Sequence, residues 1–344
     1  MKAVTINSYG NSSVLNIEDI PIPETKSNEV LVQVKYSSIN PIDIMKREGY
    51  GRRIFEKQRK LLFPWVIGSD FSGIVIKTGS KVTKFKEGDK VWGCTSSPLR
   101  GTYAEYVNFV SEEIDFMPTN IDFESAATIP YAALTTWAAV IRWAGLRPQD
   151  IREKKILVKA ASGGVGTIAV QLFKHWQAFI ATTSSKKNID LLSNLGSDLT
   201  IDYASEDFSE IIKEFDIVYD CLGDIAGEEE VHKTINTLKP HINSQYITLN
   251  HPFMREIDSN GILTGVPKAL LKRNAIKRKY SPINIHWSLY RPSLSGLEEI
   301  RRLVEAGIIK PVLDSTYPIE SIVKAHLKVE TARTVGKISL KVSD

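Results

Sequence analysis

A glycine-rich turn, Ala161-Ser162-Gly163-Gly164-Val165-Gly166, is the stretch of this sequence with the clearest chemical use. Small residues let the backbone approach a pyrophosphate, and the first free N–H groups of a following helix point at the anion. The G-x-G-x-x-G fingerprint would place glycines at 161, 163 and 166, so Ala161 makes the match partial. A structural glycine turn in another α/β protein is the alternative. We expect a dinucleotide to bind here, at Ser162, Gly163, Gly164 and Val165.

The elements around the turn must hold it between a strand and a helix. The apolar run that starts at Ile156 is typical of a buried strand, and the apolar spacing from Ile168 to Trp176 is typical of a helix. The alternation continues with strands expected at 155–160, 178–183, 198–202, 215–221 and 244–249, and helices near 165–176, 188–195, 205–213 and 228–238. This order predicts an α/β protein with a doubly wound parallel sheet.

The regions on either side of this sheet have other patterns. The first 125 residues are dense in short strands and turns, which predicts a compact β-rich domain, and the β character of 312–319 and 336–342 suggests that the C-terminal piece rejoins it. Residues 252–282 interrupt the alternation with a basic stretch, Lys268 to Tyr280. This stretch is either an amphipathic patch that touches an anionic surface or a solvated helix or loop.

The bulk composition restricts the class of protein. With 344 residues the chain should form two domains, and two cysteines exclude a disulfide scaffold. No apolar run approaches the roughly twenty residues needed to span a bilayer. The sequence starts directly in a strand pattern, without a signal peptide or transit segment, so a cytoplasmic protein is expected. The net charge of +4 gives little reason to expect nucleic acid as a partner.

The residues about twenty positions past the glycines favour one nicotinamide cofactor. NAD sites usually carry Asp or Glu there for the ribose 2′-hydroxyl. This sequence has Thr182-Thr183-Ser184-Ser185-Lys186-Lys187, with no acid. Hydroxyl and ammonium groups attract a 2′-phosphate, so we expect NADPH, with Ser184 and Lys187 among its ligands. The alternative is that Lys186 and Lys187 form a solvated helix start.

The sequence resembles the zinc-independent quinone oxidoreductase branch of the medium-chain dehydrogenase/reductase superfamily. The resemblance covers almost the whole chain and rests on the stretches 38–43, 68–73, 161–166 and 201–203. Residues 39–51, 246–249 and 303–312 resemble the reticulon-four-interacting group of NADPH quinone oxidoreductases of mitochondria. The mitochondrial leader of that group is not found here, which favours a bacterial or cytosolic relative.

The resemblance implies two domains and further cofactor contacts. We expect a GroES-like substrate and catalytic domain at 1–127, completed by 309–344, and a Rossmann NADPH-binding domain at 128–308. Tyr203 would reach the 2′-phosphate. The residues implied near the nicotinamide are Thr135, Leu222, Gly223, Thr248, Leu249, Gly336 and Lys337. Thr135 lies in an apolar helix and could instead serve packing.

The resemblance also bears on metal binding and on the reaction. Asn40 and Ser69 stand where zinc enzymes of the superfamily have cysteine and histidine ligands, so we expect no zinc. The Asn40 amide would orient substrate or nicotinamide, or would only form the turn before Pro41. Lys46 and Tyr50 follow on the same loop and could donate a proton.

These expectations define one leading function and two alternatives. The leading function is NADPH-dependent reduction of a quinone or a similar electrophilic carbonyl acceptor. The alternatives are an NADPH-dependent reductase of enal or enone C=C bonds and a non-catalytic NADPH-binding scaffold. The expected partners are a small-molecule electrophile and a second copy of the chain, paired through a strand near Ile285 to Tyr290. A weak contact of 268–280 with a membrane surface is possible from the sequence, and no nucleic acid is expected.

Overall fold

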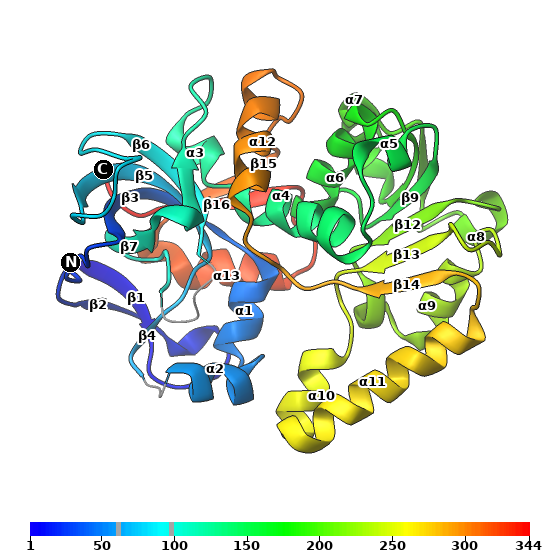
Figure 1. The fold of residues 1–344 in the computed structure, drawn as a ribbon, viewed down its shortest axis with the longest axis horizontal. Helices are drawn as coiled ribbons and strands as arrows, with labels where there is room; N and C mark the ends of the chain where they lie inside the picture. Colours follow the sequence, from blue (N-terminus) through cyan, green and yellow to red (C-terminus); the bar gives the residue numbers. More distant parts are fainter. Residues whose placement is uncertain (60–62, 96–99) are drawn as a thin grey trace. The chain divides into compact units, whose positions relative to one another are not determined.

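The structure, a computed structural model, describes residues 1–59, 63–95 and 100–344 (Figure 1). The chain divides into two units. Unit 1 comprises Met1–Leu134 and Arg291–Asp344, and unit 2 comprises Thr135–Tyr290. Each unit has its own sheet system and its own hydrophobic core.

A parallel sheet of six strands forms the centre of residues 135–290, all of which are described. Its order, β11-β10-β9-β12-β13-β14, is the 3-2-1-4-5-6 order of dinucleotide-binding folds. The strands are β9 (Lys155–Lys159), β10 (Phe179–Ser184), β11 (Leu199–Asp202), β12 (Ile217–Asp220), β13 (Gln245–Thr248) and β14 (Asn284–Trp287). The predicted doubly wound parallel sheet is confirmed, and the strand order reverses between β9 and β12.

Most residues of these strands are buried, because helices cover both faces of the sheet. On one face Phe208, Ile235 and Ala269 pack against the strand residues Val218 and Tyr246. The helical segments, starting with the helix that enters unit 2, are α4 (Pro130–Trp137), η3 (Ala138–Trp143), α5 (Pro148–Ile151), α6 (Gly164–His175), η4 (Lys186–Asn188), α7 (Ile189–Leu195), α8 (Phe208–Ile211), η5 (Gly223–Ala226), α9 (Glu228–Ile235), α10 (Phe253–Asn260) and α11 (Ile262–Lys279). The interruption at 252–282 is therefore mainly the helix pair α10 and α11.

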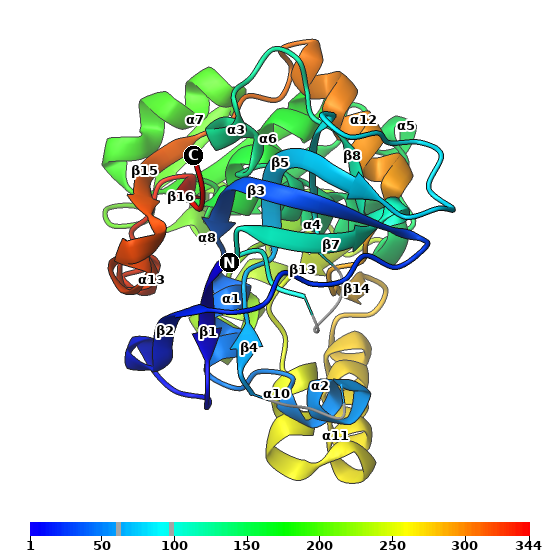
Figure 2. The same ribbon diagram turned by 90° about the vertical axis from the view of Figure 1, so that its left-hand side faces the viewer.

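Unit 1 is built around the long strand β3, which lies beside β5 (Figure 2). Alternating apolar residues such as Val30, Val32 and Val34 bury one face of β3. The strands of unit 1 are β1 (Lys2–Ile6), β2 (Leu15–Asp19), β3 (Glu29–Ile39), β4 (Trp65–Val66), β5 (Asp70–Thr78), β6 (Lys90–Cys94), β7 (Tyr106–Val110), β8 (Ile114–Phe116), β15 (Leu313–Pro318) and β16 (Lys337–Lys341). Its helical segments are η1 (Ser12–Val14), α1 (Pro41–Arg47), α2 (Arg52–Arg59), η2 (Ser111–Glu113), α3 (Phe123–Ala126), α12 (Leu294–Glu305), η6 (Ile319–Ser321) and α13 (Ile322–Glu330).

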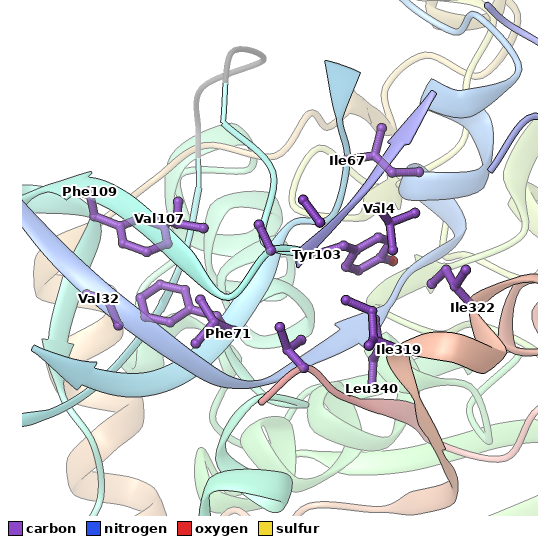
Figure 3. Packing of buried hydrophobic residues seen from close by; sticks show 14 of the residues in the cluster. Val4, Val32, Ile67, Phe71, Tyr103, Val107, Phe109, Ile319, Ile322 and Leu340 are labelled. Carbon is purple, nitrogen blue, oxygen red and sulfur yellow. The ribbon is translucent and has the colours of Figure 1, made fainter. Parts of the chain in front are cut away.

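The core of unit 1 joins residues from distant parts of the sequence (Figure 3). Phe71 stacks on Phe109 with ring centroids 4.0 Å apart, a contact that contributes about 0.5–1.5 kcal/mol beyond its buried area. Ile322 and Leu340 pack in the same cluster, beside Tyr103. The C-terminal segment therefore supplies part of this core, as the sequence predicts.

The boundaries of the two units differ from the predicted domain boundaries of 127/128 and 308/309. The main difference is α12, which falls in unit 1. Arg301 on α12 forms an ion pair with the buried Asp115 at 2.8 Å, and Asn120 donates a hydrogen bond to the Val304 carbonyl at 2.9 Å. These polar contacts tie α12 to the end of β8, and its amphipathic sequence alone did not indicate which sheet it covers.

None of the helices in the described ranges combines the length and the apolar character that crossing a bilayer requires.

We predict that His326→Gln flattens the loss of stability at acid pH. Burial, followed by the adjacent Arg47 guanidinium, lowers the pKa of His326 to about 3, compared with about 6.5 in an unfolded chain. Between these values only the unfolded chain takes up the proton, so this contribution to stability falls as the pH drops below about 6.5. At about pH 5 the wild type should lose about 2 kcal/mol that the variant does not lose.

Urea unfolding at about pH 7 and about pH 5 measures this difference. His241→Gln is the matched control because His241 is exposed, and it should keep the pH dependence of the wild type. The same fall in the free energy of unfolding for His326→Gln and the wild type would contradict the prediction.

Candidate functional site

The glycine turn lies at the carboxyl end of β9, where strand order reverses, and leads directly into α6. Ala160, the residue before the turn, has a φ of 54°, a left-handed conformation that is strained for an alanine. Ala161 is fully buried. Strained backbone of this kind is found preferentially at binding sites. The strain therefore adds to the reasons for treating the turn as a functional element.

Two glycines of the turn have different structural needs. A Cβ on Gly166 would come within 2.6 Å of Ala161 Cα, so this glycine is required for close packing of α6 on the turn. A Cβ on Gly163 would meet only the Ala160 carbonyl oxygen, at 3.5 Å, an ordinary contact. Nothing in the described fold requires glycine at 163, so the space above it is free for a ligand.

The N-terminus of α6 is suited to an anion. Gly163 is its N-cap and contributes no side chain, so no side-chain oxygen caps the first N–H groups of the helix. Those N–H groups and the positive end of the helix dipole are the usual ligands of a pyrophosphate. Ser162, Gly164 and Val165 are all half-buried around this point. A pyrophosphate therefore fits the residues present.

The residues predicted to bind a 2′-phosphate lie at neighbouring strand ends. Ser184 ends β10, and the Tyr203 backbone N–H donates to the Ser184 carbonyl at 3.2 Å. Tyr203 has a side chain that is largely exposed, and Lys187 is exposed at the start of the next helical turn. The carboxylate of Asp202 is engaged by Ala204 N–H and the Ser205 hydroxyl, each at 3.1 Å. The structure thus brings Ser184 and Tyr203 together, with Lys187 three residues beyond Ser184.

Four of the residues predicted near the nicotinamide lie at the ends of β12 and β13, namely Leu222, Gly223, Thr248 and Leu249. A Cβ on Gly223, whose φ is +49°, would clash with Thr248 Oγ1 and with the Asn250 carbonyl, both at 2.2 Å. The backbone N–H groups of Leu222 and Gly223 both donate to Asp220 Oδ1 at 2.9 Å, and Leu249 N–H donates to the Asp220 carbonyl at 3.1 Å. Asp220 therefore ties these two segments together.

A cavity of about 260 Å³ opens beside the end of β13. Its lining includes Thr248, one of the predicted residues, and Trp287, on which His251 stacks with ring centroids 5.1 Å apart. Burial lowers the pKa of His251 to about 4, so the ring is neutral at physiological pH. Its Nδ1 has no hydrogen-bond partner among the described residues. His251 and Trp287 are site candidates that the sequence interpretation missed, because no motif contains them.

The remaining predicted cofactor residues have other surroundings. Thr135 is half-buried on α4, at the boundary of the two units. Gly336 has a φ of +70°, and a Cβ there would come within 2.1 Å of the Val312 carbonyl oxygen, so the turn before β16 itself requires this glycine. The side chain of Lys337 is directed into the interior of unit 1, where it joins a cluster of buried polar groups.

The cluster forms where three strands of unit 1 share one end. Asn40 directly follows β3, while Asp70 and Lys337 are the first residues of β5 and β16. Since β5 and β16 both pair antiparallel with β3, their first residues flank its last ones. The strand register therefore brings together residues separated by up to 297 positions.

A buried ion pair dominates the electrostatics of this cluster. Lys337 Nζ lies 3.6 Å from Asp70 Oδ2, and both side chains are almost fully buried. Burial raises the pKa of the Asp70 carboxyl, an effect opposed by Lys337, and burial lowers the pKa of the Lys337 ammonium, opposed by Asp70 and then Asp43. Removing one partner of such a pair costs about 3–5 kcal/mol, so each charge depends on the other.

Asn40 occupies the centre of the cluster with all its amide groups engaged. Its Nδ2 donates to Asp70 Oδ1 at 3.0 Å and to Asp43 Oδ2 at 3.2 Å, and its Oδ1 accepts from Lys337. Its exposure is only 2%. The amide is thus already committed within the protein, which differs from the expectation of a donor free for substrate. Asp43 also accepts from the Asn40 backbone N–H at 3.0 Å, so Asn40 also starts α1.

Lys46 and Tyr50, the predicted proton donors, follow on α1 and the turn after it. Lys46 Nζ donates to Ser69 Oγ at 3.4 Å, and Ser69 Oγ in turn donates to Asp43 Oδ1 at 2.5 Å. Tyr50 is half-buried, as is Lys46. Lys46 is therefore connected to Asp43 through one hydroxyl.

Tyr103 is a further member of the cluster that the sequence interpretation missed. Its hydroxyl donates to Asp43 Oδ2 at 3.1 Å, and burial together with the Asp43 and Asp70 carboxylates raises its pKa well above the usual range. The phenol therefore stays protonated. A single aromatic residue in a β pattern gives no sign of such a polar contact.

The donor set at this position is poor in metal ligands. Asn40 and Ser69 supply an amide and a hydroxyl, both engaged in hydrogen bonds, in place of a thiolate and an imidazole. Across residues 1–59, 63–95 and 100–344, no three His, Cys, Asp or Glu side chains gather as a metal site would require.

Comparison with known families matches both parts of the chain. Residues 26–118 match the alcohol dehydrogenase GroES-like domain, and residues 195–340 match the zinc-binding dehydrogenase family. The first match falls within unit 1. The second begins before β11 in unit 2 and ends in β16.

Individual proteins are similar over nearly the whole chain. The human mitochondrial NAD(P)H oxidoreductase RTN4IP1 is 34% identical over 357 residues, covering 99% of this chain and 89% of that protein. The structure of a quinone oxidoreductase from Coxiella burnetii is similar with a TM-score of 0.81 at 29% identity, covering 100% of this chain and 99% of that one. A 2-methylene-furan-3-one reductase of Solanum lycopersicum is 30% identical over 349 residues, covering 98% of this chain and 78% of that protein.

One expectation from the sequence is corrected by these relatives. A cytoplasmic protein was expected from the pattern at the N-terminus, but the human protein and its counterparts in mouse, cattle and zebrafish are named mitochondrial. The prediction of a cytoplasmic location is therefore wrong. The sequence pattern of the first residues was too weak a basis for it.

We predict that Gly163→Ala weakens NADPH binding and leaves the stability of the fold unchanged. Gly166→Ala, in contrast, should destabilise the fold. The added methyl at 163 enters the space of the ligand, whereas at 166 it meets the turn itself. NADPH affinity of Gly163→Ala should fall at least about tenfold, the loss of one charge-assisted hydrogen bond.

Fluorescence titration with NADPH and thermal unfolding measure the two effects. Gly145→Ala is the control for NADPH affinity: its Cβ meets nothing within 4 Å, but its φ of +69° strains an alanine, so it should lower the unfolding midpoint and keep wild-type NADPH affinity. Wild-type NADPH affinity in Gly163→Ala would contradict the placement of the pyrophosphate at this turn.

Proposed function

We propose a mechanism from the premise that this chain belongs to the quinone-oxidoreductase-like branch of the medium-chain dehydrogenase/reductase superfamily. It is an NADPH-dependent oxidoreductase that transfers a hydride to a quinone or a similar electrophilic carbonyl acceptor. The observation that carries this conclusion is the open Gly163 at the N-terminus of α6, where strand order reverses. It is the binding geometry that a dinucleotide requires, on the fold of this family.

The residues of unit 2 account for cofactor choice. The N-terminus of α6 binds the pyrophosphate, and Ser184, Lys187 and Tyr203 bind the 2′-phosphate. The choice of NADPH over NADH follows from the hydroxyl and ammonium groups at this position and from the engagement of the nearby Asp202 carboxylate in its own turn. Thr135, Leu222, Gly223, Thr248 and Leu249 are proposed to line the nicotinamide.

The bound cofactor supplies a hydride, and the residues of unit 1 supply the proton and the positioning. Reduction of a quinone to a quinol needs one hydride and one proton, so a single donor suffices. Lys46 is proposed as this donor because its ammonium is held by Ser69, which Asp43 orients. Tyr50 is the second candidate. Asn40 and Lys337 are proposed to act through position, by fixing the start of α1 and hence Lys46.

The reaction is proposed to proceed without zinc. The ligand positions of zinc relatives carry Asn40 and Ser69, whose hydrogen bonds connect Asp43, Asp70 and Lys337. A quinone is a strong electrophile and needs no Lewis acid to accept a hydride. The Lys337 ammonium supplies a fixed positive charge within the protein interior at this position.

A reductase of activated C=C bonds is the second candidate function. It is favoured by the similarity to a 2-methylene-furan-3-one reductase, whose name describes an enone substrate. The same cofactor residues would serve it, and only the acceptor pocket would differ. A non-catalytic NADPH-binding scaffold is the remaining alternative, and it requires that no acceptor oxidise the bound cofactor.

A homodimer is proposed to form through β14. This strand pairs on one side with β13 and ends the described six-stranded sheet on the other. An edge strand of this kind presents unpaired backbone groups to a second copy.

We predict that NADPH reduces 1,4-naphthoquinone with a kcat/KM at least about tenfold above that for a simple α,β-enone, because a quinone needs less acid catalysis. Oxidation of NADPH, followed at its near-ultraviolet band, measures both rates, and NADH serves as the cofactor control. A faster reaction with the enone would assign the second function, and no oxidation by either acceptor would favour the scaffold.

We predict that Asn40→Ala lowers kcat with NADPH and a small quinone at least about tenfold. Without the amide, Asp70 and Lys337 lose the partner to which both bind. Asp43, which accepts a hydrogen bond from Ser69, loses its hydrogen bond with the Asn40 side chain. The dissociation constant of NADPH should stay unchanged, since the hydrogen bonds of the Asn40 amide go to Asp43, Asp70 and Lys337 and not to the pyrophosphate turn.

Steady-state kinetics and fluorescence titration separate the two quantities. Asn7→Ala, which removes an exposed amide on the loop after β1, is the matched control. A wild-type kcat in Asn40→Ala would remove Asn40 and its cluster from the mechanism.

A further inference from the structure

Helix α11 carries an excess of positive charge that the protein does not neutralise. Its eighteen residues include six basic and no acidic side chains. Among the described residues, only Lys272 forms an ion pair, with Glu256 on α10. The other five basic residues are Lys268, Arg273, Lys277, Arg278 and Lys279.

The positive charge of α11 contributes to the pKa shifts of neighbouring groups. Burial and then Arg273 lower the pKa of Lys277, and burial followed by Lys277 lowers the pKa of His286 to about 4. The acids that face α11 are at the level of Lys272, where Glu256, Asp224 and Glu228 raise its pKa. In the C-terminal half of the helix, beyond Lys272, the positive charge is therefore not balanced by facing carboxylates among the described residues.

The packing of α11 fixes which side faces outwards. A Cβ on Gly265 would come within 2.4 Å of the Glu256 carbonyl oxygen, so α10 approaches closely at this glycine. Ala269, one turn later, is fully buried in the core of unit 2. Ile276 continues this inner stripe at helical spacing and packs against the same core. Figure 1 shows α11, in yellow, as a long helix beside β14 and α9.

The outward side of α11 carries exposed leucines as well as cations. Leu263 is 90% exposed, Leu271 68% and Leu270 41%. Leu263, Leu270 and Lys277 are seven residues apart, as are Leu271 and Arg278, so these leucines and cations share one face. Single exposed leucines are common, but three on one helical face beside unpaired cations form a patch that requires an explanation.

We propose that α11 is a membrane-surface helix that binds an anionic lipid bilayer. Leu263, Leu270 and Leu271 enter the boundary between headgroups and acyl chains, and Lys277 and Arg278 bind lipid phosphates. The protein is then peripheral, lying on one leaflet, in agreement with the finding that no described helix could cross a bilayer. This inference does not depend on the acceptor proposed above.

Two other occupants fit this face less well. A second copy paired through α11 would place two unneutralised positive helices against each other, which costs free energy. Nucleic acid would satisfy the cations but would leave the leucines in water, because phosphate contacts offer no apolar partner. Of these three occupants, a bilayer surface alone satisfies both the charge and the apolar side chains.

Vesicle co-sedimentation of the full-length protein tests the proposal. The wild type should sediment with vesicles of phosphatidylcholine and phosphatidylserine, remain in the supernatant with phosphatidylcholine alone, and dissociate as salt is raised. Lys277→Glu/Arg278→Glu should bind at least about tenfold more weakly. Leu263→Gln/Leu271→Gln should bind at least about fivefold more weakly with no change in charge.

Matched variants control for charge and for folding. Lys324→Glu/Arg333→Glu makes the same change in net charge at exposed positions of unit 1, and Ile242→Gln removes another exposed apolar side chain of unit 2. Both should bind as the wild type does. All variants should keep the thermal unfolding midpoint of the wild type, because the altered side chains are exposed.

Three results would overturn the proposal. The first is no binding to the anionic vesicles. The second is wild-type binding by Leu263→Gln/Leu271→Gln, which would reduce the effect to general charge attraction. The third is a change of oligomeric state in the leucine variant, measured by sedimentation velocity without vesicles, which would assign this face to a second copy. If the first result came with a DNA gel shift, nucleic acid would replace the bilayer as the partner.

Discussion

The ion pair between Asp70 and Lys337 is the interaction on which the organisation of unit 1 depends. Two buried charges are tolerated only when each compensates the other and the remaining hydrogen-bonding capacity is filled. Asn40 meets that requirement by bonding to both residues, and Asp43, Ser69 and Tyr103 extend the same hydrogen-bonded group. The hydrogen-bonded group therefore ties together the end of β3 and the first residues of β5 and β16.

The same arrangement shows how buried positive charge can be held among carboxylates by hydrogen bonds. A divalent cation and a buried ammonium both place positive charge among carboxylates, but they differ in what they require. Zinc needs several soft ligands at fixed angles, whereas an ammonium needs acceptors within hydrogen-bond distance. Asn40 and Asp70 provide such acceptors around Lys337.

Periodic features of the sequence predicted the framework well. The alternation of buried strands with helical patterns predicted five of the six strands of the described sheet in unit 2, because burial on both faces leaves continuous apolar runs. The pattern did not reveal that α12 packs in unit 1, since its apolar stripe would suit either sheet. Nor did it reveal the contact of Lys337 with Asn40, because a lysine at the start of a strand is normally solvated. Such contacts depend on strand register, which a single sequence does not state.

In the candidate site, too, some residues belong to sequence motifs and others are brought together only by the fold. Gly163 and Ser184 were singled out from the sequence because a dinucleotide uses strand ends at regular positions along a repeated β-α unit, whereas Tyr203 was implied only by the family resemblance. The stacking of His251 on Trp287 and the contact of Tyr103 with Asp43 were not predictable, because they join segments that share no motif. The outward leucines of α11 were visible in the sequence, but only the close approach at Gly265 shows which side of the helix is covered.

The distance along the chain between Asn40 and Lys337 has a consequence for biosynthesis. The two residues are 297 positions apart, and the whole of unit 2 is translated between them. Domains generally fold as units while the chain emerges from the ribosome. Unit 2 can therefore acquire its structure first, while Asp70 and Asp43 remain hydrated carboxylates in an incomplete unit 1. The nascent chain would be exposed to chaperones and proteases until β16 arrives and supplies the missing cation.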